Sequence, residues 1–327
     1  MKAVQSAAVG GRLLQNRRLR AQLLLFSGII LVYLIFNGVL DGRLLTATNL
    51  RIILSHAVFP ALVAWGMSFF FSTGIIDLSV GSNIILSANV GCYLATRLNL
   101  GMPGLIVGTI LTCMLLQHLN IRAIIDLEIP SWIAGLGAAL VYEAITAQYM
   151  YTQNIMALDL PNKYRPLGNM PYLGIVYFAA FAVAYFLSNR TTVGLNIKAL
   201  GGNQQVAGSM GIDRKKTVII GALIGAAFIG MGAVIQISYA GRVYATTGLG
   251  SLASIFQALA CVLLSGSIAS ILSPPVGILV SSFFVVSIFN VLTMLGVPSG
   301  TGQDIFLGVI VVVCGILSHL RHKGVVK

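Results

Sequence analysis

The sequence predicts an all-α polytopic membrane protein, a single domain over residues 1–327 with about ten transmembrane helices and broken helices in the two halves. Three features of composition support this class: 57% of the residues are hydrophobic, 9% are charged, and the mean hydropathy is +0.93. Soluble domains carry about 25% charged residues. Because lipid offers no water to backbone polar groups, helices are the expected spanning structure, and the alternation typical of barrel strands is not visible.

Ten apolar segments approach or exceed the length of about 20 residues that a helix needs to cross a bilayer. They are residues 22–40, 52–72, 76–96, 101–118, 131–149, 171–187, 218–238, 253–270, 276–294 and 303–320. A basic amphipathic lead at 1–21 precedes the first segment. A short helix or loop at 41–51 precedes the second, with Thr48 or Asn49 expected as its helix cap. Residues 150–170 form the longest loop on the opposite side from the termini.

The Lys and Arg residues are divided unevenly between the two sets of loops. With the N-terminus in the cytoplasm, fourteen of the twenty lie in cytoplasmic segments and six lie on the other side. This bias is the one that membrane insertion produces, and it predicts that both termini are cytoplasmic. Topology and contact with anionic lipid account for the net charge of +12, so we expect no nucleic-acid partner.

No motif for catalysis or metal binding is visible. HExxH, GxSxG and the phosphate loop GxxxxGK[ST] are all absent, so we expect no enzyme activity, no cofactor, no metal site and no ATP hydrolysis by this chain. The cysteines lie in apolar segments without a CxxC pair and are interpreted as small buried residues. The histidines have no metal-ligand spacing and are interpreted as structural; those near predicted span ends are His56, His118 and His319.

Polar and glycine residues interrupt two of the apolar stretches. One interruption is residues 71–83, and the other comprises 264–267 and 273–277. Non-helical backbone at membrane depth persists only where it is buried in protein or lines a cavity, and interrupted helices in corresponding halves point to a transport path. The polar groups of these regions are therefore candidates for the substrate path: Asp77, Ser79, Asn83, Gln257 and Ser265.

Two carboxylates in apolar segments have more than one interpretation. A charge at the bilayer centre costs about 2.5–3.5 kcal/mol on insertion scales, so Asp77 must be paired, capped or facing water. It is either a residue of a pathway or gate, or a helix cap that accepts bonds from free backbone N–H groups. Glu143 follows the same logic, although it lies closer to the outer end of its segment and could reach the interface.

The most conspicuous polar segment is residues 188–217, which carries five of the twenty Lys and Arg residues between two apolar segments. A basic, glycine-containing loop of this kind suggests a docking surface for a cytoplasmic partner. The alternative is that its charges anchor the loop at the lipid surface.

Three motifs together resemble the permease subunits of bacterial ABC importers of the ribose, simple-sugar and autoinducer-2 type. They are the TGIIDLSVGS sequence at 73–82, the IPSWIAGLG sequence at 129–137, and the glycine-containing loop from Gly194 to Ile212. The resemblance extends from about residue 40 to 320. It implies the translocation subunit of an importer in the bacterial inner membrane that takes up a small polar solute, a monosaccharide or a related compound.

The resemblance also implies partners. They are cytoplasmic ABC ATPase subunits, a second permease chain, and a periplasmic or lipid-anchored solute-binding protein. Part of the loop would form the coupling helix that sits in a groove of the ATPase. The residues carried over for this coupling are Gly201, Gly202, Asn203, Gln204, Ala207, Gly211 and Ile212.

The second half departs from the pattern of the family. Where relatives have an acidic, glycine-rich stretch, residues 251–267 have lost both acidic residues and several glycines, and Gly208 replaces a common arginine. These changes suggest one half of a heterodimeric pair. An alternative function is a secondary transporter driven by an ion gradient, with Asp77 or Glu143 as its ion site.

Overall fold

The computed structural model describes residues 2–153, 159–298 and 300–323. These residues form α-helices and short 3-10 helices and contain no strand, and seven of the helices are long and apolar enough to cross a membrane. The prediction of an all-α polytopic protein is confirmed. The helices are α1 (Lys2–Val39), α2 (Ala47–Phe71), α3 (Val80–Thr96), α4 (Gly101–Leu127), α5 (Ser131–Gln153), η1 (Asn162–Tyr164), η2 (Pro166–Gly168), α6 (Tyr172–Arg190), α7 (Thr192–Gly202), α8 (Gln204–Ser209), α9 (Arg214–Ala240), η3 (Gly250–Ile255), α10 (Phe256–Ser267), α11 (Pro274–Met294) and α12 (Thr301–Lys323).

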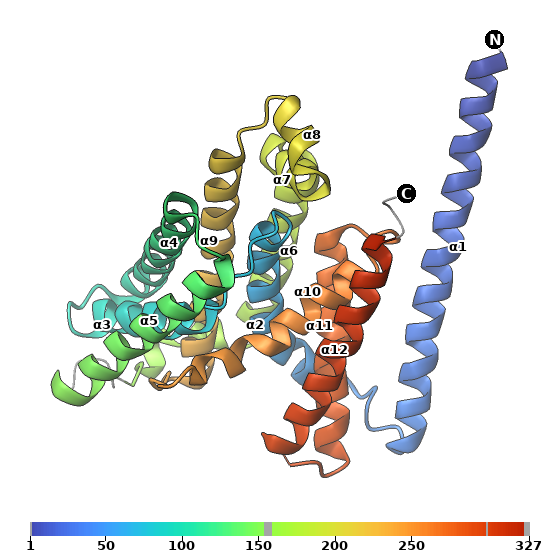
Figure 1. Cartoon of the computed structure of the whole chain (residues 1–327). Coiled ribbons are helices and arrows are strands. Elements are labelled where there is room, and N and C mark those ends of the chain that lie inside the picture. The colour runs from blue at the N-terminus through green and yellow to red at the C-terminus, as the bar shows by residue number, and fades with distance from the viewer. Residues whose placement is uncertain (1, 154–158, 299, 324–327) are drawn as a thin grey trace.

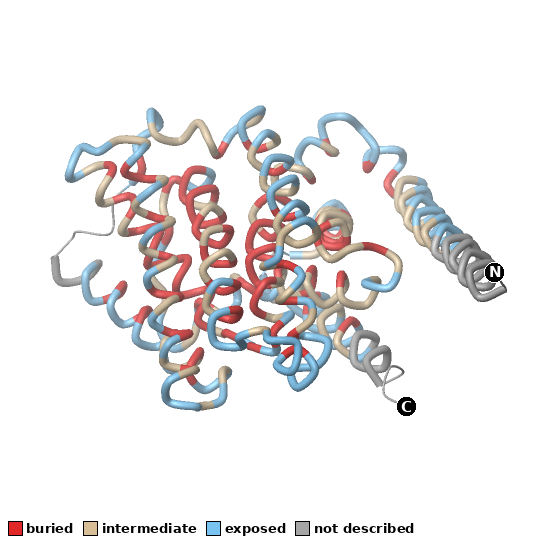
Figure 2. The backbone as a smooth tube through the Cα atoms, turned by 90° about the horizontal axis from the view of Figure 1, so that it is seen from above, coloured by how far each residue is buried: buried red, intermediate tan, exposed pale blue. Residues whose placement is uncertain are grey.

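The helices α2 and α9 form the centre of the molecule, and α1 lies at its edge (Figure 1). The start of α1, the end of α12, and the short helices α7 and α8 lie at the same end, which we call the α8 end. Buried residues are concentrated in the central helices, whereas the described part of α1 shows only exposed and half-buried residues (Figure 2).

Glycine brings the two central helices into close contact. A Cβ atom at Gly66 of α2 would lie 2.5 Å from the carbonyl oxygen of Gly225 of α9, and one at Gly225 would lie equally close to the Gly66 oxygen. Small residues at a crossing point allow backbones to approach in this way. The Trp65 indole next to this crossing donates to the Pro275 oxygen at 3.1 Å, which joins α2 to the start of α11.

Several predicted boundaries differ from those in the structure. Thr46 caps α2, because its hydroxyl accepts from the Asn49 N–H at 3.3 Å, so the expected cap at Thr48 or Asn49 is wrong. The basic lead at 1–21 continues directly into the first apolar segment within α1. The third predicted segment starts at Val80 rather than 76, and the eighth starts with the 3-10 helix η3. In the predicted loop at 150–170, residues 154–158 lie outside the described part.

Candidate functional site

The break between α2 and α3, residues 72–79, places Asp77 at the start of a helix. Asp77 is fully buried. Its Oδ1 accepts from the Ser79 N–H at 2.8 Å, and its Oδ2 accepts from the Gln117 amide of α4 at 2.7 Å. The carboxylate therefore holds the turn that leads into α3, whose N-cap residue is Ser79, and fastens this turn to α4.

The two other path candidates from this region are also bonded to neighbouring helices. The Asn120 amide donates to the Ser79 hydroxyl at 3.2 Å, and the Asn83 amide donates to the Cys113 carbonyl at 3.2 Å. Both Ser79 and Asn83 are fully buried. Together with Asp77 they form a polar contact between α3 and α4 inside the protein.

Glu143 of α5 holds the segment that precedes α10. Its carboxylate accepts from the backbone N–H of Leu249 at 2.9 Å and of Ser251 at 2.8 Å, and it lies 3.5 Å from the Thr246 hydroxyl. The start of α3 lies against this segment, since a Cβ at Gly81 would overlap the Ser251 carbonyl. The first break thus meets the segment before α10 inside the protein, and one carboxylate anchors each of these two segments. The second predicted break, at 264–267 and 273–277, is instead the end of α10 and the start of α11.

A cavity of about 590 Å³ opens at the end of the molecule opposite the α8 end. Its walls are the start of α2, the end of α9, the start of α10, the end of α11 and the start of α12. The polar side chains that line it are mostly neutral amides and hydroxyls: His56, Gln236, Ser254, Gln257, Asn290, Thr293, Gln303 and Asp304. We call this the amide cavity.

One sequence-predicted path residue, Gln257, lines the amide cavity, whereas Asp77, Ser79, Asn83 and Ser265 do not. The Ser265 hydroxyl is buried and donates to the Pro274 carbonyl at 3.1 Å, so it links α10 to α11. The structure therefore divides the five candidates into one cavity residue and four that form contacts between helices.

Sequence reasoning missed most of the cavity. Gln236 and Asn290 are each the single amide residue in an otherwise apolar segment. An amide isolated in this way was the feature of the sequence that could have identified them as cavity residues. The Gln236 Oε1 atom is buried without a hydrogen-bond partner, and Asn290 Oδ1 accepts from the Asn49 amide at 3.0 Å. His56, interpreted as structural, is exposed at the cavity with its Nε2 3.5 Å from the Tyr239 hydroxyl.

At the α8 end, residues 191–213 form two short helices with well-defined ends. Thr191 caps α7 by accepting from the Gly194 N–H at 3.2 Å. Asn203 caps α8, and Asp213 caps α9 by accepting from the Lys216 N–H at 3.0 Å. Gly211 has φ +82°, which glycine adopts without strain. A capping side chain or a glycine with positive φ is present at each helix end, so local interactions define the conformation of this segment.

The predicted coupling residues divide into an exposed and an inward-facing set. Ala207 is buried and Ile212 is half-buried against the core, while the other five are exposed: Gly201, Gly202, Asn203, Gln204 and Gly211. Two apolar side chains that sequence reasoning missed are also exposed on α8 and its cap, Val206 at 53% and Met210 at 71%. Four residues apart, they lie on the same face of one helical turn.

Residues 191–213, which we call the coupling segment, also contact the break at 72–79 directly. A Cβ atom at Gly201 would overlap the Ser72 carbonyl oxygen at the end of α2, whereas one at Gly202 would meet nothing within 4 Å.

Within α7, burial lowers the pKa of the Lys198 ammonium, which donates to the Asn189 side-chain oxygen at 2.7 Å.

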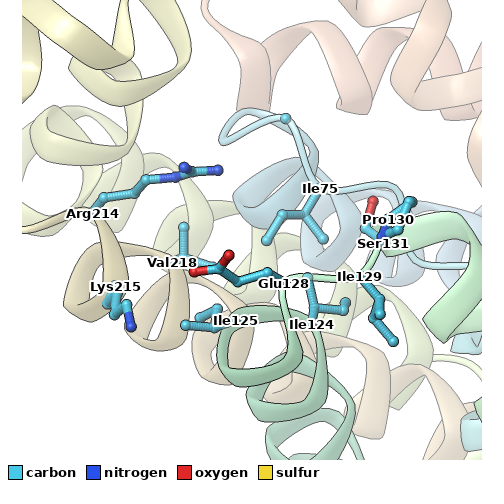
Figure 3. A pocket seen from close by; sticks show the side chains of 11 residues that line it. Ile75, Ile124, Ile125, Glu128, Ile129, Pro130, Ser131, Arg214, Lys215 and Val218 are labelled. Carbon is cyan, nitrogen blue, oxygen red and sulfur yellow. The ribbon is translucent and has the colours of Figure 1, made fainter.

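A second cavity, of about 530 Å³, lies at this end between the break and the start of α9. Figure 3 shows the Glu128 carboxylate near the middle of the view and directed toward α9, which contributes Arg214 and Lys215. Ile75 from the break and Ser131 from α5 also line this cavity. The Ser131 hydroxyl accepts from the Ile76 N–H at 3.1 Å. The coupling segment contacts both elements that bound this cavity: the break, through Gly201 and Ser72, and α9, against which α7 packs.

Comparison with known proteins identifies the family of this chain. The family model described as "branched-chain amino acid transport system / permease component" matches residues 49–314. The autoinducer 2 import system permease protein LsrC of Salmonella paratyphi B is 26% identical over 95% of this chain and 91% of its own length. The inner membrane ABC transporter permease protein YjfF of Escherichia coli is 28% identical over 72% of each chain. No solved structure gives a significant match. The chain therefore belongs to this family of transport-system permease components.

Proposed function

We propose that this chain is the translocation subunit of an ATP-driven importer, and that its solute enters through the amide cavity. The observation that carries this proposal is the position of the cavity. In a chain of a permease family, a cavity lined by amides lies at the end opposite a capped helical segment with exposed apolar side chains. One end thus offers a site for a small polar molecule, and the other offers a site for a protein partner.

The cavity favours a neutral solute rich in hydroxyl groups, such as a monosaccharide or a related compound like the autoinducer named for the relatives. The name of the family suggests an amino acid instead. A zwitterion needs a cationic partner for its carboxylate, and no Lys or Arg is among the described residues that line the amide cavity. Amides such as Gln236, Gln257 and Asn290 both donate to and accept from hydroxyls.

The chain would lie in the inner membrane with the α8 end in the cytoplasm. In addition to the seven long apolar helices, α3, α5 and α12 would complete ten spans. The common position of the start of α1, the end of α12 and α8 supports placing both termini on one side, and the excess of basic residues in the segments at that end supports the cytoplasm.

The ATPase would bind at the coupling segment. The exposed residues Val206 and Met210 offer an apolar surface for a groove of the partner, and the contact between Gly201 and Ser72 offers a route from this surface to the break. A solute-binding protein would deliver the solute at the other end. The second permease subunit would be a different chain, because residues 251–267 of this one lack the acidic, glycine-rich stretch that the resemblance implies.

The structure argues against an ion-driven carrier. Both carboxylates proposed as ion sites already accept hydrogen bonds from protein groups, Asp77 from Ser79 and Gln117 and Glu143 from backbone N–H groups.

The test is an affinity pull-down of the full chain from its native membrane, followed by uptake of labelled solutes into vesicles that contain the recovered complex. We expect an ATPase and a second permease chain in the complex, and uptake that requires ATP. Gln257→Ala removes one hydrogen bond to the solute, worth about 1 kcal/mol, and should raise the KM about fivefold. Ser265→Ala, on the same helix but outside the cavity, is the control.

Uptake by the chain alone under an ion gradient would refute the importer. Recovery of an ATPase with this chain as the sole permease, in an active complex, would refute the heterodimer while leaving the importer in place.

A further inference from the structure

An apolar groove separates α1 from the body of the protein. It consists of a wider part of about 580 Å³ and a narrower part of about 350 Å³. The two parts are continuous, because Ile29, Val280 and Phe284 line both of them. One wall is α1 and the floor is mainly α11, and α2 and α6 close the wider part.

The helix α1 spans this groove without filling it. None of its residues from Leu19 to Val39 is buried, although Leu25, Ile29 and Val32 face the body and are half-buried. Hydrogen bonds tether the helix at separate levels: the Gln22 amide donates to the Ile271 carbonyl at 3.0 Å, and the Tyr33 hydroxyl donates to Ser287.

The groove has a cation at one end. Arg51 lines its wider part, in the first turns of α2 at the end opposite α8. The side chain is exposed, and no carboxylate pairs with it among the residues that the structure describes. Below Arg51 the lining is aliphatic and aromatic, with Leu54, Phe178 and Phe283. An arginine at one end of a long apolar groove is complementary to a phospholipid, which has a phosphate at one end and hydrocarbon along the rest.

We propose that the groove holds an anionic phospholipid, with an acyl chain between α1 and α11 and the headgroup phosphate on Arg51. Both walls belong to helices that are long and apolar enough to span the bilayer, so the space between them is filled by hydrocarbon rather than water. The lipid would fill the space that α1 leaves between itself and the body. The proposal requires only that the chain is a membrane protein, and it does not depend on the transported solute.

Charge, rather than chain burial, makes the site selective. The acyl chain leaves one hydrocarbon environment for another and gains little. A basic residue near a membrane surface attracts an anionic lipid by about 1 kcal/mol. Arg51 should therefore enrich anionic over zwitterionic phospholipid about fivefold.

The experiment uses the full complex in nanodiscs made from equal amounts of phosphatidylglycerol and phosphatidylethanolamine. Native mass spectrometry after release from the disc counts the lipids that remain bound. We expect retained phosphatidylglycerol in the unmodified protein. Arg51→Gln should lower the ratio of phosphatidylglycerol to phosphatidylethanolamine about fivefold. Arg43→Gln, at the same end but outside the groove lining, should leave the ratio unchanged.

A second variant tests the groove itself. Val280→Trp places a large side chain where the two parts of the groove join, and it should reduce retention of both lipids while the complex still assembles. An unchanged lipid ratio in Arg51→Gln would overturn the proposal. So would efficient crosslinking of Ile29→Cys in one copy to Ile29→Cys in a second copy, because a protein helix would then occupy the groove.

Discussion

Asp77→Ala should destabilise the protein, whereas Asp77→Asn should leave its stability and transport nearly unchanged. This difference tests whether the carboxylate is a cap or a pathway residue. Alanine leaves the Ser79 N–H and the Gln117 amide without their acceptor inside the protein. Hydrogen bonds to a charged group contribute about 1.5–3 kcal/mol each, so Asp77→Ala should destabilise the protein by about 3 kcal/mol or more.

Asparagine should be tolerated. Its side-chain oxygen can accept from Ser79, and its amide can donate to Gln117 once the Gln117 amide rotates. The Gln117 Oε1 atom has no partner in the structure and is available for this bond. Asp77→Asn should therefore retain most of the stability and most of the transport.

The assay is thermal unfolding of the purified complex in detergent, together with ATP-dependent uptake in vesicles. At roughly 2 °C per kcal/mol, Asp77→Ala should lower the Tm by about 6 °C. Ser87→Ala is the control, because Ser87 is a buried residue of α3 whose hydroxyl donates within that helix, to the Ile84 carbonyl at 3.2 Å. Loss of transport in Asp77→Asn with an unchanged Tm would refute the interpretation as a cap, since it would mean that the charge itself is needed.

Three further substitutions test the other contacts. Glu143→Ala should lower the Tm more than Glu143→Gln, because glutamine keeps one acceptor for the Leu249–Ser251 backbone; equal effects would contradict this. Gly201→Ala should cut uptake at least severalfold while the ATPase still co-purifies, because its Cβ would push on Ser72, and Gly202→Ala should behave like the unmodified protein. Met210→Glu should prevent the ATPase from co-purifying by placing a charge in an apolar contact, and retention of the ATPase would exclude this face as the docking surface.

Features that depend on neighbours along the chain could be predicted from the sequence. The class follows from composition, and the break around Asp77 follows from a carboxylate and glycines in an apolar stretch. The ends of the coupling helices follow equally from local rules, since Asn203 and Asp213 are good caps and Gly211 suits a left-handed turn.

Features that depend on distant partners could not be predicted. The bond from Gln117 to Asp77 joins residues 40 positions apart, and the cavity residues Gln236, Gln257 and Asn290 come from three helices. Periodicity identifies the inward face of a helix only when the other face is polar. These helices are apolar on all sides because lipid surrounds them, so the direction of an isolated amide is set by packing that the sequence does not display.

The two central helices connect the two ends of the molecule. The α2 helix carries His56 at the amide cavity and ends at Ser72, where Gly201 of the coupling segment rests on it. The α9 helix runs the other way, from its cap at Asp213 to Gln236 in the cavity. Contact between their backbones at Gly66 and Gly225 prevents one helix from sliding past the other without breaking a close-packed crossing. We therefore expect α2 and α9 to move as a unit, so that a displacement of α8 by the ATPase reaches the cavity through both of them.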